Sequence, residues 1–169
     1  MTDLPAIISI SELMPEDFEW VRSIYQQGIK TKNATFETHA PDWEEWNKKF
    51  LLKPRLVAEI NKKISGWAAL SAISIRPVYS GVCEVSVYVH EDYRGQGVGR
   101  SLLRKLIDFS ESNNIWTLQA GIFPENIGSI KIHQDLGFRE VGRRERIGKM
   151  ENIWRDTILF ERRSHTYGN

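Results

Sequence analysis

The chain has 169 residues, of which 41% are hydrophobic and 27% charged, and these proportions are typical of one soluble globular domain. The formal net charge of +1 excludes the strong positive field that recruits nucleic acid or an anionic membrane surface. The single cysteine, Cys83, excludes an internal disulfide and a cysteine-built zinc site, and no apolar run approaches the length of a membrane span.

We therefore expect a cytoplasmic protein with neither nucleic acid nor a membrane as a partner, since the first residues also lack the basic-then-apolar pattern of a secretion signal. Residues 1–163 are predicted to form a single domain, and 164–169 are predicted to form a frayed polar tail.

The first third of the chain predicts a strand and two helices. Residues 7–13 are a first strand, and the acidic, proline-led start at 15–17 opens a helix. Pro41-Asp42 opens a second helix. The apolar residues of these helices recur at helical spacing: Phe18, Val21, Ile24, Tyr25 and Ile29 in the first, and Trp43, Trp46 and Phe50 in the second.

The middle of the chain changes to the period of strands. Residues 55–60 and 64–72 are two predicted strands around a polar turn, and 73–83 is irregular. A strand at 84–90 and a helix from 97 to about 112 follow. The apolar residues on one face of this helix are Val98, Leu102, Leu103, Leu106 and Ile107.

The last third predicts a strand at 116–122, a helix at 126–136 ended by Gly137, and two closing strands at 138–146 and 153–161. Three consecutive strands in the middle predict an antiparallel meander, and the later strand–helix–strand order predicts a parallel crossover. The predicted fold class is therefore α/β, with a mixed, mostly antiparallel sheet of about seven strands and helices on both faces.

A glycine cluster lies between the strand at 84–90 and the next helix. It reads Arg94-Gly95-Gln96-Gly97-Val98-Gly99, with Arg100 following. Glycines let the main chain turn tightly, and the first N–H groups of a helix have no partner within it, so the cluster can bind an anion the size of a diphosphate. A phosphate-binding P-loop is excluded because positions 94 and 100 are arginines rather than glycine and lysine. A dinucleotide-binding fingerprint is excluded because the glycine spacing is G-x-G-x-G rather than G-x-G-x-x-G. A plain glycine-rich turn remains the alternative.

Arg94-x-x-Gly97-x-Gly99 resembles the signature of the GNAT superfamily of N-acetyltransferases, which bind the pyrophosphate of acetyl-CoA on such a loop. Further segments resemble one branch, the phosphinothricin or methionine sulfoximine acetyltransferases, also described as L-amino acid N-acyltransferases. These segments are 34–37 (ATFE), 84–89 (EVSVYV), 120–126 (AGIFPEN), 133–138 (HQDLGF) and 150–156. The resemblance covers most of the chain and implies the GNAT fold, acetyl-CoA as co-substrate, no metal and, as is typical of the branch, a homodimer.

The resemblance also implies which residues bind the coenzyme besides the loop. The main chain of Val87, Tyr88 and Val89 is expected to pair with the pantetheine arm like an added strand, in a slot where this strand splays from the one at 116–122. One N–H group near Val87 is expected to polarise the thioester carbonyl. Asn126 matches a coenzyme-contacting asparagine, and its alternative role is that of a helix N-cap.

Glu84 and His133 are the candidate catalytic residues. Glu84 begins an otherwise apolar strand near the expected acyl carbon, where a carboxylate can take a proton from the amine; a solvated glutamate is the alternative. A peptide α-amino group with a pKa near 8 costs about 1.4 kcal/mol to deprotonate at pH 7 and a lysine about 4.6 kcal/mol, so one modest base suits an α-amine better. His133 stands where many family members carry a tyrosine as general acid. Imidazole can protonate the leaving thiolate, and a structural histidine is the alternative.

The acceptor is expected to bind between the early segment that contains Phe36 and the irregular segment 73–83. Arg76 is a candidate for gripping a substrate carboxylate, and a solvated arginine is its alternative. The other substrate-binding candidates are apolar walls and residues of the catalytic strand: Phe36, Tyr79, Trp154, Glu84, Val85 and Ser86. The branch often places a histidine in a late loop where this chain reads KMEN at 149–152. Cys83 is expected to be a small buried hydrophobe rather than a nucleophile.

These observations predict an acetyl-CoA-dependent N-acetyltransferase that acts on a small amino acid or analogue, with Glu84 as base. Two alternatives stay open, namely an acetyltransferase of protein or peptide N-termini and a coenzyme-binding module without catalysis. A walled acceptor site favours a small substrate and an open groove favours a peptide, whereas Glu84 argues against the module without catalysis.

Overall fold

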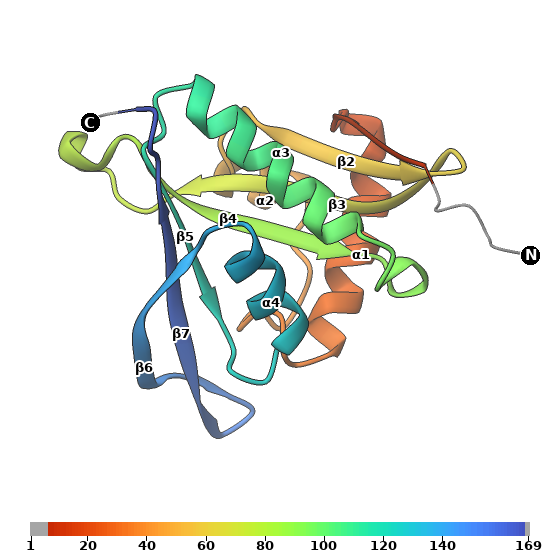
Figure 1. The fold of residues 1–169 in the computed structure, drawn as a ribbon. Helices are drawn as coiled ribbons and strands as arrows, with labels where there is room; N and C mark the ends of the chain where they lie inside the picture. Colours follow the sequence, from red (N-terminus) through yellow and green to blue (C-terminus); the bar gives the residue numbers. More distant parts are fainter. Residues whose placement is uncertain (1–6, 168–169) are drawn as a thin grey trace, which may run out of the picture.

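In the computed structural model, which describes residues 7–167, a seven-stranded sheet lies between helices on both of its faces (Figure 1). The strands are β1 (Ile8–Glu12), β2 (Arg55–Ile60), β3 (Lys63–Ala72), β4 (Val82–Val89), β5 (Thr117–Ile122), β6 (Arg139–Met150) and β7 (Ile153–Arg163). The helices are α1 (Phe18–Lys30), α2 (Trp43–Lys49), α3 (Val98–Ser112) and α4 (Ile127–Asp135). Three short 3-10 turns lie at Pro15–Asp17, Pro77–Tyr79 and Glu91–Tyr93. The predicted fold class is confirmed. None of the helices within residues 7–167 combines the length and apolarity that a bilayer crossing requires.

The sheet has the order β1-β2-β3-β4-β5-β7-β6, and its neighbours are antiparallel except for β4 and β5. The predicted antiparallel meander (β2, β3 and β4) and the predicted parallel crossover (β4 and β5 through α3) are therefore both confirmed. β4 and β5 pair at only three positions, the last of which joins Glu84 to Gln119. The expected splay between these two strands thus begins directly after Glu84.

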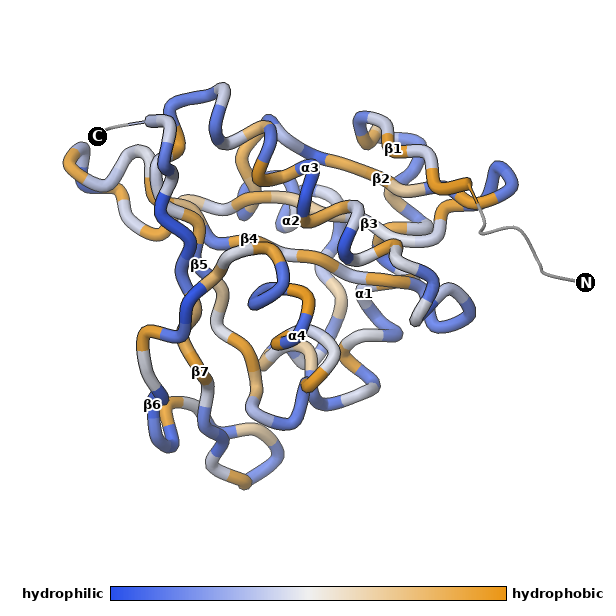
Figure 2. Tube along the Cα trace, in the orientation of Figure 1, coloured by the Kyte–Doolittle hydropathy of each residue, from blue (hydrophilic) through white to orange (hydrophobic). Residues whose placement is uncertain are grey.

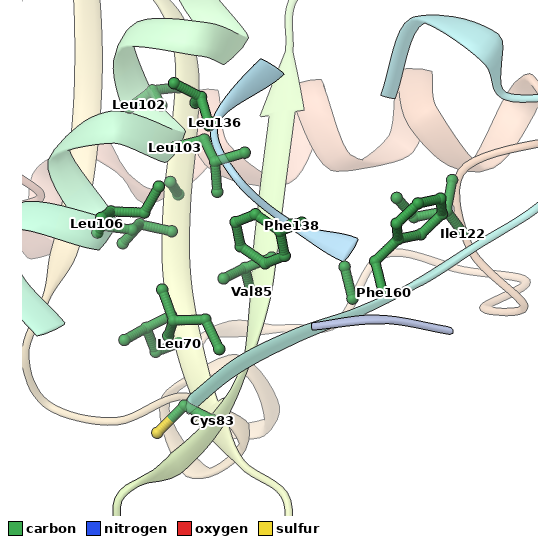
Figure 3. Packing of buried hydrophobic residues seen from close by; sticks show 14 of the residues in the cluster. Leu70, Cys83, Val85, Leu102, Leu103, Leu106, Ile122, Leu136, Phe138 and Phe160 are labelled. Carbon is green, nitrogen blue, oxygen red and sulfur yellow. The ribbon is translucent and has the colours of Figure 1, made fainter. Parts of the chain in front are cut away.

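Two hydrophobic cores lie on opposite faces of the sheet. On one face the apolar stripe of α3 packs with Val85 and Phe138 (Figure 3), and on the other α1 and α2 pack with Trp67. Successive residues of β3 alternate between the two cores, so that Trp67 points to one and Ala68 to the other, as strand geometry requires. Figure 2 shows hydrophobic residues along much of β3 and β4. Cys83 is 1% exposed in the α3-side core, as expected of a small hydrophobe.

Helix α2 begins at a capping box. The Asp42 carboxylate accepts a hydrogen bond from the Glu45 N–H (2.9 Å), and the Glu45 carboxylate accepts one from the Asp42 N–H (3.2 Å). The predicted Pro41-Asp42 start is confirmed. The cap matters for the site, because the last residue of this short helix is Lys49, whose side chain enters the central cavity.

The closing hairpin is longer than its sequence pattern predicts. The pattern ends the first closing strand at Arg146, whereas β6 runs to Met150. The predicted loop at 149–152 is shorter than expected, because Lys149 and Met150 belong to β6 and only Glu151 and Asn152, with φ of 46° and 66°, form a tight two-residue turn before β7. The register of β6 shifts at two places, and each shift breaks the alternation of faces from which a strand is read.

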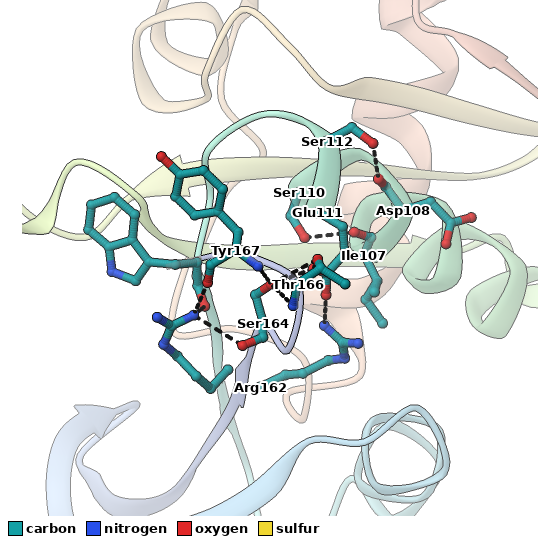
Figure 4. Close-up of polar contacts among 11 residues, drawn as sticks. Ile107, Asp108, Ser110, Glu111, Ser112, Arg162, Ser164, Thr166 and Tyr167 are labelled. Carbon is teal, nitrogen blue, oxygen red and sulfur yellow. Dashed lines mark hydrogen bonds and ion pairs between the residues drawn. The ribbon is translucent and has the colours of Figure 1, made fainter. Parts of the chain in front are cut away.

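The C-terminal residues are anchored where the sequence predicts fraying. Ser164 is buried, and its hydroxyl and that of Thr166 donate to the Glu111 carboxylate near the end of α3 (Figure 4). Arg162 pairs with the same carboxylate at 2.6 Å. The described part of the predicted tail, residues 164–167, therefore holds β7 to α3; residues 168 and 169 lie outside the described residues.

Because three donors converge on it, Glu111 should make the stability of the fold depend on acid. Although burial works the other way, the hydrogen bonds from Ser164, Thr166 and Arg162 lower its pKa from 4.5 to about 2. The carboxylate therefore stabilises the fold above its unfolded pKa, and this stabilisation is lost as the pH falls from about 4.5 toward 2.

We expect Glu111→Gln to lower the free energy of unfolding by about 1–2 kcal/mol at pH 6 and by much less at pH 2.5. Urea unfolding at both pH values measures this difference. The exposed Glu145→Gln serves as the control. A destabilisation by Glu111→Gln that is equal at the two pH values would show that the charge of Glu111 does not contribute.

Candidate active site

The divergence of β4 from β5 opens a cavity of about 1200 Å³ that crosses the sheet. We call its two parts the loop end and the Glu84 end. The loop end is formed by the glycine cluster and α4, with Arg94, Gly95, Gly97, Val98, Gly99, Arg100, Asn126, Ser129 and His133. The Glu84 end is formed by the loop after α1, the end of α2 and three strands, with Phe36, Glu37, Lys49, Glu84, Arg144 and Thr157.

The main chain of β4 presents a free edge to this cavity. At the two ends of the β3–β4 pair, the Ile73 N–H donates to Val82 and the His90 N–H donates to Ser65. Because hydrogen-bonded positions alternate along an antiparallel pair, the even-numbered residues of β4 are bonded to β3. The odd-numbered residues after the splay therefore present the C=O of Val85 and both the N–H and C=O groups of Val87 and Val89 to the cavity, whereas the Val85 N–H faces Gln119 in the last pair with β5.

Tyr88 differs from its two neighbours. Its main chain faces β3, and its ring stacks on Trp67 with centroids 4.9 Å apart, on the face opposite α3. The predicted coenzyme contact through the Tyr88 main chain is thus not favoured by the strand geometry, whereas those of Val87 and Val89 are.

The glycine cluster has the geometry of an anion site. Gly95 and Gly97 have φ of 75° and 88°, which glycine adopts without strain, and α3 begins directly after Gly97. Because Gly97 has no side chain to cap the helix, the first N–H groups of α3, from Val98 to Arg100, stay open toward the cavity. The predicted turn and helix start are confirmed.

Two of the predicted loop residues have protein partners. The Gln96 side chain donates to the Asp92 carbonyl (3.0 Å) and does not line the cavity. Arg100 lines the cavity, but its guanidinium is paired with Asp135 of α4 at 2.9 Å. The main-chain N–H groups, rather than these two side chains, are the donors that remain available.

Helix α4 lies along the loop end of the cavity, with Asn126 just before its first residue and His133 near its last. The Asn126 side chain accepts from the Ser129 N–H (3.2 Å) and donates to the Asn33 carbonyl (3.1 Å), so its expected role as a helix N-cap is confirmed. His133 is 4% exposed, and its Nδ1 lies 2.7 Å from the Ser129 carbonyl, which requires Nδ1 to carry the hydrogen.

The chemistry available to His133 is set by that tautomer. Nε2 is then the acceptor nitrogen, and it is buried with no partner among the described residues. Burial lowers the pKa of His133, although the hydrogen bond to the Ser129 carbonyl opposes this. The imidazole is therefore neutral at pH 7. The geometry favours a structural histidine over a general acid that is already protonated before the reaction.

Glu84 lies where the two strands part, at the centre of the cavity. Its side chain is half-buried, and within residues 7–167 it has no ion-pair partner. Burial raises the pKa of Glu84, and the positive charges of Lys49 and Arg144 partly oppose this rise. A carboxylate with a raised pKa is a stronger base than an ordinary glutamate, which is what proton removal from an amine needs.

Charged side chains from the other elements surround Glu84. Lys49 pairs with Glu37 at 3.1 Å, so the charge of the lysine is largely balanced. Arg144 of β6 is held by its Nε, which donates to the Thr157 hydroxyl at 3.1 Å. Phe36 forms the predicted aromatic wall and packs edge-on against Phe123 with centroids 4.8 Å apart.

Some of the predicted substrate-binding residues line the cavity and others do not. Val85 and Ser86 line it, as Phe36 does. Arg76 and Tyr79 instead pack against each other on the β3–β4 connection, with the guanidinium 5.4 Å from the ring centroid. Trp154 lines a separate groove of about 480 Å³ beside the β6–β7 hairpin. The structure of a single chain thus does not bring these three to the Glu84 end.

The sequence reasoning missed the charged residues that do surround Glu84: Glu37, Lys49 and Arg144, with Thr157 beside the arginine. Glu37 and Lys49 are single charges among others on polar segments, and no local pattern distinguishes them. The alternation of β6 could have placed Arg144 and Thr157 on one face as a cross-strand pair, but the register shifts of β6 conceal it.

Comparison with known proteins gives this arrangement a context. A family model described as the Acetyltransferase (GNAT) family matches residues 9–138. Phosphinothricin N-acetyltransferase of Alcaligenes faecalis is 33% identical over 87% of this chain and 78% of that protein. L-methionine sulfoximine/L-methionine sulfone acetyltransferase of Pseudomonas aeruginosa is 36% identical over 95% of this chain and 89% of that protein.

Solved structures share the fold over nearly the whole chain. An acetyltransferase of Salmonella typhimurium, determined with its cofactor acetyl-CoA, has a TM-score of 0.86 and 26% identity over 97% of this chain and 99% of that one. Ribosomal-protein-alanine N-acetyltransferase of Brucella melitensis has a TM-score of 0.85 and 27% identity over 92% of this chain and 99% of that one.

The electrostatics around Glu84 can be tested directly. Removing a positive charge that now favours its ionised form, in Lys49→Met or Arg144→Gln, should raise the pKa of Glu84 further. Carboxyl carbon chemical shifts of glutamate-labelled protein, followed through a pH titration, measure it. Arg143→Gln, which removes the neighbouring cation paired with Asp156, should leave it unchanged. A Glu84 pKa that does not respond to Arg144→Gln would contradict the assignment of Arg144 to its surroundings.

Proposed function

Because the chain belongs to the Acetyltransferase (GNAT) family, we propose that it moves the acetyl group of acetyl-CoA directly onto the amino group of a small amino acid or analogue, with Glu84 as the base. The observation that carries this proposal is the divergence of β4 from β5 directly after Glu84, because it places a free main-chain edge and a carboxylate in one cavity. Relatives named for phosphinothricin and for methionine sulfoximine support the class of acceptor.

The loop end has the donors that acetyl-CoA needs. The open N–H groups from Val98 to Arg100 would bind the pyrophosphate at the start of α3. The edge of Val87 and Val89 would pair with the pantetheine arm, which carries amides of its own, and this would direct the thioester toward Glu84. Asn126, through its place at the start of α4, closes the other side of this path.

The proposed reaction begins when Glu84 takes one proton from the acceptor ammonium, directly or through one water. The free amine nitrogen attacks the thioester carbonyl carbon and a C–N bond forms. The Val87 N–H would stabilise the negative charge that develops on the carbonyl oxygen. The C–S bond then breaks, the carbonyl re-forms as an amide, and the second proton leaves the nitrogen. The thiolate takes up one proton, so the products are the N-acetylated amine, coenzyme A with a free thiol, and one proton released from Glu84.

The resting geometry favours a structural role for His133, so a part in protonating the thiolate is proposed only as a relay. Its Nδ1 hydrogen is bound to the Ser129 carbonyl, so Nε2, which is buried without a partner among residues 7–167, is the nitrogen that would have to exchange a proton. We propose that the imidazole, neutral at rest, relays the second amine proton rather than holding one in advance.

The cellular setting and assembly complete the proposal. A cytoplasmic homodimer is proposed, as the sequence resemblance implies. Large exposed apolar side chains support a second copy as partner, and they include Ile75 and Val78 on the β3–β4 connection and Ile153 and Trp154 at the hairpin.

The proposed activity predicts which amines release thiol. We expect the purified protein to release free thiol from acetyl-CoA with L-methionine sulfone, methionine sulfoximine or phosphinothricin, and not with short peptides. Glu84→Gln should lower kcat by about 10²–10⁴-fold and leave the calorimetric Kd for acetyl-CoA unchanged. For the wild type, kcat/KM should fall as the pH drops through the raised pKa of Glu84, because the base is then protonated.

Two results would change the assignment. Thiol release with peptides alone would replace the small acceptor by a protein N-terminus, the activity for which the Brucella melitensis neighbour is named. Wild-type turnover by Glu84→Gln would remove Glu84 as the base.

The anion site predicts a second effect, which concerns acetyl-CoA alone. Gly97→Ala places a Cβ on a residue with φ of 88°, which costs roughly 1–2 kcal/mol, so the loop should relax and misplace the first N–H groups of α3. We expect acetyl-CoA binding to weaken about 5–30-fold in calorimetry. Gly142→Ala, where an added Cβ meets no atom within 4 Å, is the matched control. Equal Kd values for wild type and Gly97→Ala would argue against pyrophosphate binding at this loop.

A further inference from the structure

We propose that Arg144 binds the α-carboxylate of the acceptor, so that the substrate is a free amino acid or a carboxylate-bearing analogue rather than a peptide or a simple amine. This inference rests on the proposed function and specifies its acceptor. It also replaces Arg76, which the structure holds on the β3–β4 connection outside the cavity.

The guanidinium of Arg144 is fixed at one nitrogen and open at the other two. Nε donates to the Thr157 hydroxyl at 3.1 Å, and Thr157 is itself 6% exposed, which fixes the plane of the group. Among residues 7–167, Nη1 and Nη2 have neither a hydrogen-bond nor an ion-pair partner. A planar fork with two free donors matches the two oxygens of a carboxylate.

The direction of this fork follows from the pairing of the strands. Arg144 is opposite Thr157 on β7, and the Gly121 position on β5 is on the same face of the sheet as Glu84. Nη2 lies 2.9 Å from the point where a Cβ of Gly121 would stand. The guanidinium thus lies over β5 where that strand has no side chain, and it reaches toward the opening beside Glu84.

The charges of the Glu84 end match those of an amino acid. Lys49 and Glu37 balance each other in an ion pair. Glu84 and Arg144 carry opposite charges without forming an ion pair, yet they line the same cavity and the charge of Arg144 acts on Glu84. An acceptor with adjacent ammonium and carboxylate groups presents the complementary pair, the ammonium to Glu84 and the carboxylate to Arg144.

Other acceptors have the amine that would face Glu84 but lack the carboxylate that would face Arg144. A peptide N-terminus places a neutral amide where the carboxylate would be, and an amine without a carboxylate places nothing there. Each would leave the Arg144 fork with water alone. The arginine should therefore favour free amino acids through KM, because binding of the carboxylate is not itself part of the chemical step.

The test compares L-methionine sulfone with its α-carboxamide, which has nearly the same shape but no negative charge and a less basic amine. We expect the wild type to show a KM about 10–100-fold lower for the acid than for the amide, as one charge-assisted fork contact provides. Arg144→Gln should raise KM for the acid to that of the amide and leave KM for the amide unchanged. Arg144→Lys, which keeps the charge and loses the fork, should fall between them.

Two controls separate this role from a structural one. Arg143→Gln removes the adjacent arginine, which is paired with Asp156 at 2.6 Å and does not line the cavity, and it should change neither KM. The Kd for acetyl-CoA should be the same in all variants. An Arg144→Gln variant that loses acid and amide turnover equally, or whose only change is a shifted pH profile for both, would overturn the proposal.

Binding measured without turnover keeps this inference distinct from the proposed reaction. Calorimetric titration of L-methionine sulfone and its amide into the protein saturated with coenzyme A should show the same preference for the acid, lost in Arg144→Gln. Preferential binding without acetylation would contradict the reaction while supporting the carboxylate site. Acetylation with equal binding and equal KM for acid and amide would support the reaction and overturn the carboxylate site.

Discussion

The parting of β4 and β5 directly after Glu84 is the constraint on which the rest of the site depends. In an unbroken sheet, the N–H and C=O groups of Val85, Val87 and Val89 would bond to the next strand, since buried main-chain groups require partners. Because pairing stops at Glu84, all of these groups except the Val85 N–H remain available along a line that leads to the glycine loop. The same parting brings β5 away at an angle, and β7 and β6 continue from it, so their side chains reach Glu84 from the opposite side.

The register of β4 determines which of its residues face the cavity with their main chain and which direct their side chains to the Glu84 side of the sheet. After the splay, the odd-numbered residues turn their main chain to the cavity and pack valine side chains, buried at Val85 and partly buried at Val87 and Val89, against the α3-side core. Even-numbered residues are bonded to β3 and direct their side chains to the other face, where Tyr88 is packed against Trp67 and Glu84 is not packed but half-buried. A shift of one residue would exchange these roles, so the buried valines also determine where the carboxylate lies.

The parts of the site that could be predicted from the sequence are those that depend on local main-chain geometry. Gly97 at a helix start and the alternation of β4 leave a readable pattern, because each requires particular residue types at adjacent positions. The acceptor side has no such pattern: Lys49 is far in the chain from Arg144 and Thr157 of the β6–β7 hairpin, and they meet only in the folded protein. The register shifts of β6 hide the strand that carries Arg144, and the anchoring of Ser164 depends on Glu111, 53 residues earlier. Arg76 had a suitable side chain but lies on a connection that the sheet order directs away from the cavity.

The separation between Glu84 and Arg144 resolves two opposing demands on the site. An arginine in direct contact would lower the pKa of the carboxylate and weaken it as a base, and the ion pair would occupy the donors of the guanidinium. An arginine far away would leave the acceptor's negative charge unmatched. The Thr157 hydroxyl and the open backbone of Gly121 hold the guanidinium at an intermediate position, where burial still raises the pKa of Glu84 and both Nη groups stay free. In the proposed complex, a zwitterion between them would present its ammonium to Glu84 and its carboxylate to Arg144, and the charge of the bound carboxylate would weaken the effect of Arg144 on the proposed base.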